Sequence, residues 1–359
     1  MASKCRVPVL VLAWVLGAAP PATAQWQIQS ADGQNSVSIG VLAQPQFETT
    51  RLEGADGASS FHLRRMRFIL GGKVGNRISF FIDTDVPNLG KPDASGRKAG
   101  ASFTIQDAVF TYTLAGKVNL EAGMIIVPVA RHATQSAANL LGVDYAPFSF
   151  SHSDPTGSNC GRDYGVQARG YLFDNHLEFR AGIFDGKRGA GATMPLRYAV
   201  RAVWHALEAE TGLFYAGTSL GKRRVFSLGA SIDRQDDYMA RAVDIYLDHP
   251  AGGGRLGLTA QMNYTRYDGG QTFTELPAQD VWMVEGGLFD SRSRLGPFLQ
   301  WTSRQYRAAE LSDESRVTGG LAYWAEGHRY NIKAGVGRHT TAGGKRRMLI
   351  VTQLQVFLF

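Results

Sequence analysis

Apolar residues recur at every second position along most of the chain, in pieces of about ten residues. Val37, Ile39 and Val41 share one face of such a piece, and Phe110 and Tyr112 share a face of another. A period of two is typical of a strand with one apolar face. About ten residues is also the length of a tilted strand that crosses a membrane in a barrel. The pattern therefore predicts an all-β fold whose strands are long enough to cross a bilayer.

The alternating pattern can be divided into a definite set of segments. Sixteen are found, at 37–47, 61–74, 78–86, 103–114, 120–126, 164–173, 176–184, 196–206, 223–234, 238–248, 255–267, 281–290, 295–306, 316–326, 330–339 and 346–359. Residues 212–219 could form a short seventeenth strand. Single-chain bacterial barrels have an even number of strands with both termini in the periplasm, so we interpret 207–222 as a long periplasmic connection.

The connections and the strand number together predict a closed barrel. Tight turn dipeptides such as Gly75-Asn76 alternate with longer polar segments, which are 48–60, 87–102, 128–162, 186–195 and 269–279. Short turns on one side and long loops on the other suit the periplasmic and extracellular sides of a barrel. An open sheet would leave an unpaired edge in lipid, so the strands must close. We expect residues 25–359 to form one domain, a 16-stranded antiparallel transmembrane β-barrel with room for an aqueous channel.

The long apolar run at the N-terminus predicts export. Two basic residues precede the apolar residues 7–16, and Ala22-Thr23-Ala24 has the small residues of a cleavage site. This run is too short for a membrane-spanning helix and is typical of a removable signal peptide, residues 1–24. The chain ends on the aromatic Phe359, which resembles the recognition signal of outer-membrane barrels. We therefore expect the chain to lie in a Gram-negative outer membrane.

Charged residues opposite the apolar face of a strand are candidates for lining the channel. On the lipid side each arginine or lysine would cost about 2–4 kcal/mol at the membrane midplane, so these residues must face the lumen. They are Arg65, Arg67, Lys73, Arg169, Arg180, Arg201 and Arg304. Arg64 extends the cluster in the second strand, where little acid lies nearby in the sequence. Arginine is always charged and can grip oxyanions with two hydrogen bonds, which favours an anion or phosphate pore. The alternative is an ordinary polar lumen with both signs of charge, because Asp83, Asp85, Asp107 and Glu285 also face inward.

The connection 128–162 is the second functional candidate. It is too long for a plain turn and too apolar for a freely solvated loop, since Leu140, Leu141 and Phe148 lie within it. We expect it to fold into the barrel mouth and to bring Arg131, His132 and Arg162 toward the passage. The alternative is an extracellular loop that packs on itself or on a neighbouring subunit.

Several stretches resemble the phosphate-selective porin O and P family. They are FHLRRMR at 61–67 followed by Gly71-Gly72, GMIIVPVAR at 123–131, LFDNHLEFRAGIFDG at 172–186, LGASID at 228–233 and VDIYLD at 243–248. The resemblance implies a trimeric sixteen-stranded channel in which an arginine ladder leads anions to a lysine-lined constriction. Arg64, Arg65 and Arg67 match the ladder motif, whereas no lysine lies within 128–162.

Other chemistry has little support in the sequence. His152 lies between Ser151 and Ser153 without a placed acid, so we expect no catalytic residues. After cleavage Cys160 is the only cysteine, and the histidines are scattered, so we expect no disulfide, no metal and no cofactor. The net charge of +7 is explained by inward arginines, so we expect no nucleic-acid partner.

Three functions remain for comparison. The first is a passive porin that prefers anions such as phosphate, embedded in outer-membrane lipid or lipopolysaccharide and assembled as a homotrimer. The second is a general or sugar-preferring porin, and the third is a barrel enzyme or adhesin. Pore conductance separates a porin from an enzyme, and reversal potential separates anion preference from preference for neutral solutes.

Overall fold

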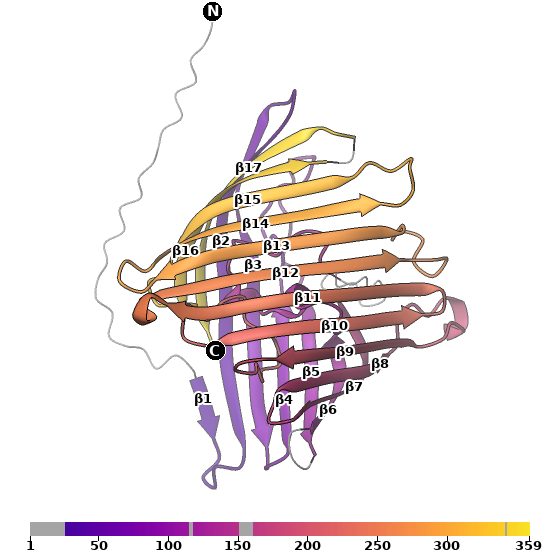
Figure 1. The fold of residues 1–359 in the computed structure, drawn as a ribbon, viewed down its shortest axis with the longest axis vertical. Coiled ribbons are helices and arrows are strands. Elements are labelled where there is room, and N and C mark those ends of the chain that lie inside the picture. Colours follow the sequence, from indigo (N-terminus) through magenta and orange to yellow (C-terminus); the bar gives the residue numbers. More distant parts are fainter. Residues whose placement is uncertain (1–25, 115–117, 151–160, 342) are drawn as a thin grey trace, which may run out of the picture.

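The computed structural model describes residues 26–114, 118–150, 161–341 and 343–359. Its wall consists of sixteen antiparallel strands, each paired with its neighbour in the sequence (Figure 1). These strands are β2 (Ser36–Leu52), β3 (Gly57–Val74), β4 (Ile78–Asp85), β5 (Thr104–Thr113), β6 (Val118–Ile126), β7 (Arg162–Leu172), β8 (Leu177–Phe184), β9 (Arg197–His205), β10 (Val225–Gln235), β11 (Tyr238–Ala251), β12 (Leu256–Asp268), β13 (Gln279–Asp290), β14 (Leu295–Tyr306), β15 (Glu314–Tyr323), β16 (Tyr330–Thr340) and β17 (Arg346–Leu358).

The barrel closes where the last strand pairs with the first strand of the wall. Val351 of β17 lies opposite Glu48 of β2, and the pairing extends along both strands. No edge is then left for lipid to solvate, which is the condition for strands to cross a membrane. The predicted closed sixteen-stranded barrel is therefore confirmed. In Figure 1 the strands β10–β15 run across the view in front of the steeply inclined β2–β6, as expected for strands tilted around a barrel.

Side chains alternate between the lumen and the outside along each strand. In β9 every second residue from Arg197 to His205 is buried, while Tyr198, Val200 and Trp204 are exposed. The exposed residues are apolar and the buried ones include arginines, which is the reverse of a soluble protein. A wall that meets lipid outside and polar groups inside requires this arrangement.

The strand boundaries differ from the prediction in a few places. β2 and β3 continue through most of the predicted loop 48–60 and leave a turn only at 53–56. Thr49 lies opposite Ser59, and their hydroxyl groups are 2.9 Å apart. Polar β-branched residues are still favourable in a strand that extends beyond the lipid. A prediction that ends each strand at its last apolar residue therefore makes these two strands too short. A four-residue strand, β1 (Trp26–Gln29), pairs with the start of β2 and was not predicted.

Residues 206–224 connect β9 to β10 at the end of the barrel that carries the tight turns, such as 75–77. The segment 212–219 is not a strand, since Tyr215 forms only an isolated bridge with Gln135. That bridge joins it to the long connection between β6 and β7, which begins at residue 127 and contains the short helices η1 (His132–Thr134) and η2 (Ala137–Asn139). Residues 127–150 of that connection and residues 206–224 lie inside the barrel, where wall residues such as Gln355 and Arg180 donate hydrogen bonds to them. Among the described residues no helix is long and apolar enough to cross a membrane.

Candidate functional site: the lumen and its arginines

A bulge in the first wall strands turns two consecutive arginines into the lumen. The register of β2 against β3 shifts between Ala43 and Pro45, so that Gln44 lies opposite both Arg64 and Arg65. A bulge places an extra residue in one strand and redirects the side chains around it. Strict alternation would have put the two arginines on opposite faces of the wall. The bulge explains how both reach the lumen, where the family resemblance had placed them.

Asp144 of the long loop binds both of these arginines. Its carboxylate accepts from Arg64 Nε and from Arg65 Nη2, each at 2.5 Å, and Arg65 also donates to Gln44 at 2.9 Å. Burial alone would raise the pKa of the Asp144 carboxyl, but the charges and hydrogen bonds of Arg64 and Arg65 hold it well below its ordinary value. Asp144 therefore acts as a built-in anion on this part of the ladder.

A cavity of about 280 Å³ lies between Asp144 and the inner wall formed by β2, β3 and β14–β17. Its charged and titratable lining residues are Glu48, Arg64, Lys91, Asp144, Arg316, His339 and Arg347. Lys91 forms an ion pair with Glu48 at 2.6 Å. The cavity thus has four permanent cations against two carboxylates, which leaves it positively charged.

Two cations without an ion pair, Arg316 and Arg347, lie in one row on either side of His339, which contacts the carboxylate of Glu314 at 3.3 Å. Arg316 of β15 lies opposite His339 of β16, and His339 lies opposite Arg347 of β17. Arg316 donates to the hydroxyl of Thr318 at 3.3 Å. Within the described parts of the chain, neither Arg316 nor Arg347 has a carboxylate within ion-pair distance. Neither arginine is among the residues predicted from the sequence, although Arg316 and Thr318 alternate with the outward Val317, which is the pattern of inward side chains.

The opposite half of the lumen holds a second arginine row, which is covered. Arg169, Arg180 and Arg201 lie opposite one another on β7, β8 and β9, as the sequence predicted for inward residues. Each is buried and has its own carboxylate, which belongs to Glu121, Glu178 and Asp244 respectively. Backbone carbonyls of residues 211–213 accept from Arg169 and Arg180, so the segment 206–224 lies directly on this row.

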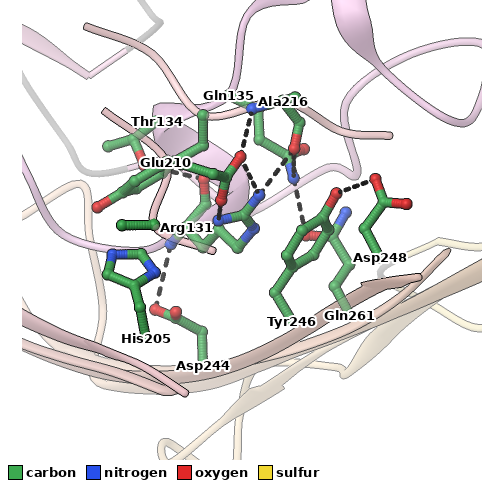
Figure 2. Close-up of polar contacts among 12 residues, drawn as sticks. Arg131, Thr134, Gln135, His205, Glu210, Ala216, Asp244, Tyr246, Asp248 and Gln261 are labelled. Atoms are coloured by element: carbon green, nitrogen blue, oxygen red, sulfur yellow. Dashed lines mark hydrogen bonds and ion pairs between the residues drawn. The ribbon is translucent and has the colours of Figure 1, made fainter. Parts of the chain in front are cut away.

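Arg131 fixes the two inner segments to each other (Figure 2). Its guanidinium donates to both oxygens of Glu210, which belongs to the segment 206–224. It lies 3.4 Å from the ring centre of Tyr246, and its backbone N–H donates to Asp244 at 3.2 Å. Burial and these contacts leave no access for a permeating ion, so this half of the lumen is filled by protein.

A second cavity, also about 280 Å³, lies on the other side of the loop. Arg67 lines it and is paired with Asp83 and Asp85, each at 3.0 Å, and Arg162 is paired with Asp107 at 2.9 Å. Between the two cavities, side chains from β2 and β17 hold the loop against the wall. Gln44 donates to the carbonyl of Ala137 and Gln355 to that of Ala138.

The remaining predicted residues lie away from this part of the wall. Arg304 is paired with Glu314, and its guanidinium lies 4.1 Å from the ring centre of Phe148. Lys73 is exposed near the end of β3, beside the turn 75–77. A different lysine meets the loop from the wall: Lys333 of β16 is buried and donates to the carbonyls of Leu140 and Gly142, at 2.5 and 2.8 Å. The sequence 128–162 contains no lysine, and Lys333 of the wall supplies one that contacts this loop.

Two other sequence-based expectations concern residues that the structure does not describe. The signal peptide 1–24 and the cluster Ser151, His152 and Ser153 lie outside the described residues, as does Cys160. Among the described residues, no group of three histidine, cysteine, aspartate or glutamate side chains could hold a metal ion.

The closed barrel and its charged, loop-narrowed lumen define the chain as a porin of the outer membrane. Solved porins share the fold. An anion-selective porin from Comamonas acidovorans matches with a TM-score of 0.57 at 10% identity, over 90% of this chain and 100% of that one. Salmonella typhi OmpF in complex with daunomycin matches with a TM-score of 0.58 at 13% identity, over 91% and 100%.

The family is shown by sequence. The pattern of the family "Phosphate-selective porin O and P" matches residues 38–271, more than half of the chain. The chain therefore belongs to the phosphate-selective porin O and P family, as the resemblance of its short stretches had indicated. No curated protein matches it by sequence.

Proposed function

We propose that this porin passes small solutes by diffusion with a preference for anions, phosphate among them. The route follows the wall of β2, β3 and β14–β17, because the rest of the lumen is filled by residues 127–141 and 206–224. Leu42 of β2 lines one cavity and Gln46 the other, on either side of Gln44, so the two cavities lie in succession along one strand. The observation that carries the proposal is the row of Arg316 and Arg347, whose charges are not balanced by ion pairs.

The physical reason is the low screening inside a narrow passage. Two unit charges about 4 Å apart interact by about 1 kcal/mol in bulk water and about 4 kcal/mol near a protein surface. Fixed cations therefore raise the local concentration of anions and lower that of cations. A guanidinium can also donate two parallel hydrogen bonds to a phosphate, which suits a weak binding site along the route.

The test is the reversal potential of single channels under a KCl gradient. Arg316→Gln combined with Arg347→Gln should lower the anion-to-cation permeability ratio several-fold. Arg338→Gln is the matched control, because Arg338 lies on the same strand as His339 but points outward. An equal ratio for the double variant and for the control would end this proposal.

A second candidate function is a general porin for neutral solutes. It is favoured by Asp144, which neutralises part of the ladder, and by the hydrogen-bonding side chains of Gln46, Gln300 and Thr318 in the same cavity. A reversal potential near zero under the KCl gradient, together with a high flux of sugars, would support this function instead.

The roles of individual residues and the assembly are also proposals. Arg64, Arg65 and Arg67 lie along the route and are proposed to guide anions, whereas Arg131, Arg169, Arg180 and Arg201 are proposed to hold the filled half of the lumen together. Cleavage after residue 24 and a homotrimer, which the family resemblance implies, are tested by mass spectrometry of the mature chain and of the intact complex.

A further inference from the structure

Two arginines face each other on the outer surface of the barrel. Arg241 of β11 lies directly opposite Arg266 of β12. The next residues, Ala242 and Thr265, are buried on the lumen side, so both arginines point outward. Like charges directly opposite one another destabilise a strand pair unless something balances them. In the part of the chain that the structure describes, neither has a carboxylate within ion-pair distance, and Arg241 Nε contacts only the sulfur of Met239, at 3.0 Å.

The depth of these arginines corresponds to lipid headgroups. They lie two or three residues from the loop ends of their strands, at Tyr238 and Asp268. The next outward pair toward the middle of the wall is Val243 and Tyr264. An arginine at the midplane would be costly, whereas at the border of the apolar band the cost falls to about 0–1 kcal/mol.

An apolar groove of about 360 Å³ begins at Arg241 and runs down the wall. It exists because Ala202 of β9 and Ala230 of β10 lie opposite each other and leave space that larger neighbours do not fill. Val200 and Val243 form its sides. A charged end and an apolar body together match a lipid, with a phosphate at the arginines and an acyl chain in the groove.

The acidic residues near the arginines are already bound by other groups. Asp237 accepts from the backbone of Gln271 and from the backbone and hydroxyl of Thr272. Asp280 accepts from the hydroxyl of Tyr264 and from Arg307, which lies 2.9 Å away. Asp268 accepts from the backbone of the adjoining turn. These hydrogen bonds leave the carboxylates charged: Asp237 and Asp268 line the same small cavity as the two arginines, and Asp280 lies opposite Arg266 in the strand pair. Within the described residues none of the three is within ion-pair distance of Arg241 or Arg266, so an external phosphate can take the direct contacts with both guanidinium groups.

We propose that Arg241 and Arg266 bind a phosphate of an outer-leaflet glycolipid, lipid A, whose acyl chain occupies the groove at Ala202 and Ala230. Charge complementarity selects a phosphorylated headgroup, since two guanidinium groups side by side can hold one phosphate. The loop end of the barrel, which is predicted to be extracellular, selects the outer leaflet. The site is independent of the channel, because it lies on the opposite face of the wall.

The full-length chain, purified in mild detergent and supplied with lipid A, tests the site by native mass spectrometry. The wild type should retain lipid A at least about tenfold more strongly than Arg241→Gln combined with Arg266→Gln. Arg338→Gln removes another outward arginine near a loop end and should behave as the wild type. Ala230→Phe fills the groove and should also weaken retention, without touching a charge.

The remaining arms separate the possible occupants. Dephosphorylated lipid A should bind the wild type and the double variant equally. Phosphatidylglycerol also carries an anionic phosphate but has only two acyl chains, so the wild type should retain it less strongly than lipid A; equal or stronger retention of phosphatidylglycerol would overturn the choice of lipid A. Equal retention of lipid A by the double variant and the wild type would overturn the proposal, and so would equal loss in Arg338→Gln. A disulfide cross-link between two copies of Ala230→Cys, with Cys160→Ser as background, would show that a second copy covers the groove, and would also overturn the proposal. The reversal potential should be unchanged in the double variant, so that this result stands apart from the test of anion preference.

Discussion

Replacing Asp144 with Asn should make the channel more selective for anions. The carboxylate lies 2.5 Å from both Arg64 and Arg65 and occupies the position that a permeating anion would take. Asn keeps the shape and an oxygen that can accept hydrogen bonds, but it removes the negative charge. The variant therefore removes the charge that compensates two guanidinium groups at the cavity without emptying the space between them.

The size of the effect follows from the distances. A unit charge about 4 Å from an ion changes its energy by about 1 kcal/mol in bulk water and more near a protein surface. With the smaller value, which suits a wet channel screened by salt, anions gain about 1 kcal/mol and cations lose the same amount. The anion-to-cation permeability ratio should then rise by roughly tenfold or more, since 1.4 kcal/mol is a factor of ten.

The assay is the reversal potential in a planar bilayer under a KCl gradient, at low and at high salt. Asp56→Asn is the matched control, because Asp56 is an exposed acid in the turn 53–56 at the same end of the barrel. High salt should shrink the difference between the variant and the wild type. A ratio that stays the same or falls in Asp144→Asn, with unchanged conductance, would refute the idea that Asp144 offsets the ladder.

Four further predictions follow from the same contacts. Replacing both Arg65 and Arg67 with Ala should lower the anion-to-cation ratio, because Asp83 and Asp85 lose Arg67 and Asp144 keeps only Arg64; an unchanged ratio would mean that these arginines only fill space. Arg131→Gln should lower the free energy of unfolding in urea by about 3–5 kcal/mol, because the Glu210 carboxylate is left buried without its cation. Adding Glu210→Gln should restore much of this loss. Equal unfolding free energies for the single and the double variant would contradict the pairing. The ion pair of Asp144 should contribute its full stability above the ordinary carboxyl pKa of about 3.9 and lose it only as pH falls through the lower folded pKa, so the difference in selectivity between the wild type and Asp144→Asn should hold from neutral pH down to about pH 4; loss of this difference near pH 5 would contradict it. A tag inserted at Gly270 should be labelled on intact cells and one at Gly327 should not, because the two glycines lie at opposite ends of the barrel; reversed labelling would invert the topology.

The wall of the barrel was predictable because its pattern is local. Each strand needs only an apolar residue at every second position, and sixteen such segments correspond to β2–β17. Arg169, Arg180 and Arg201 were placed inward for the same reason, because they alternate with outward apolar residues. The same dependence on local pattern explains why β1 was not predicted, since a strand of four residues is too short to show alternation.

The partners of the arginines were not predictable, because they are distant in the sequence. Asp144 lies 80 residues from Arg64, and Asp244 lies 43 residues from Arg201. The cluster at Arg64 therefore seemed to have little acid nearby, whereas in the fold it has an acid in direct contact. The sequence of residues 206–224 shows no regular alternation either, because the conformation of this segment is set by the lumen that it fills. The bulge at Gln44 depends on one extra residue in β3, which alternation cannot reveal.

The sign of the reversal potential of the wild-type channel tests the central claim most directly. The measurement uses single channels in a planar bilayer under a KCl gradient, repeated with phosphate on one side. The cavity has more permanent cations than carboxylates, because Arg316 and Arg347 have no ion pair. This predicts a reversal potential shifted from zero toward the equilibrium potential of chloride. It also predicts a lower chloride conductance when phosphate competes for the same arginines. A reversal potential at zero, or shifted toward the equilibrium potential of potassium, with no effect of phosphate on the conductance, would contradict an anion-preferring channel.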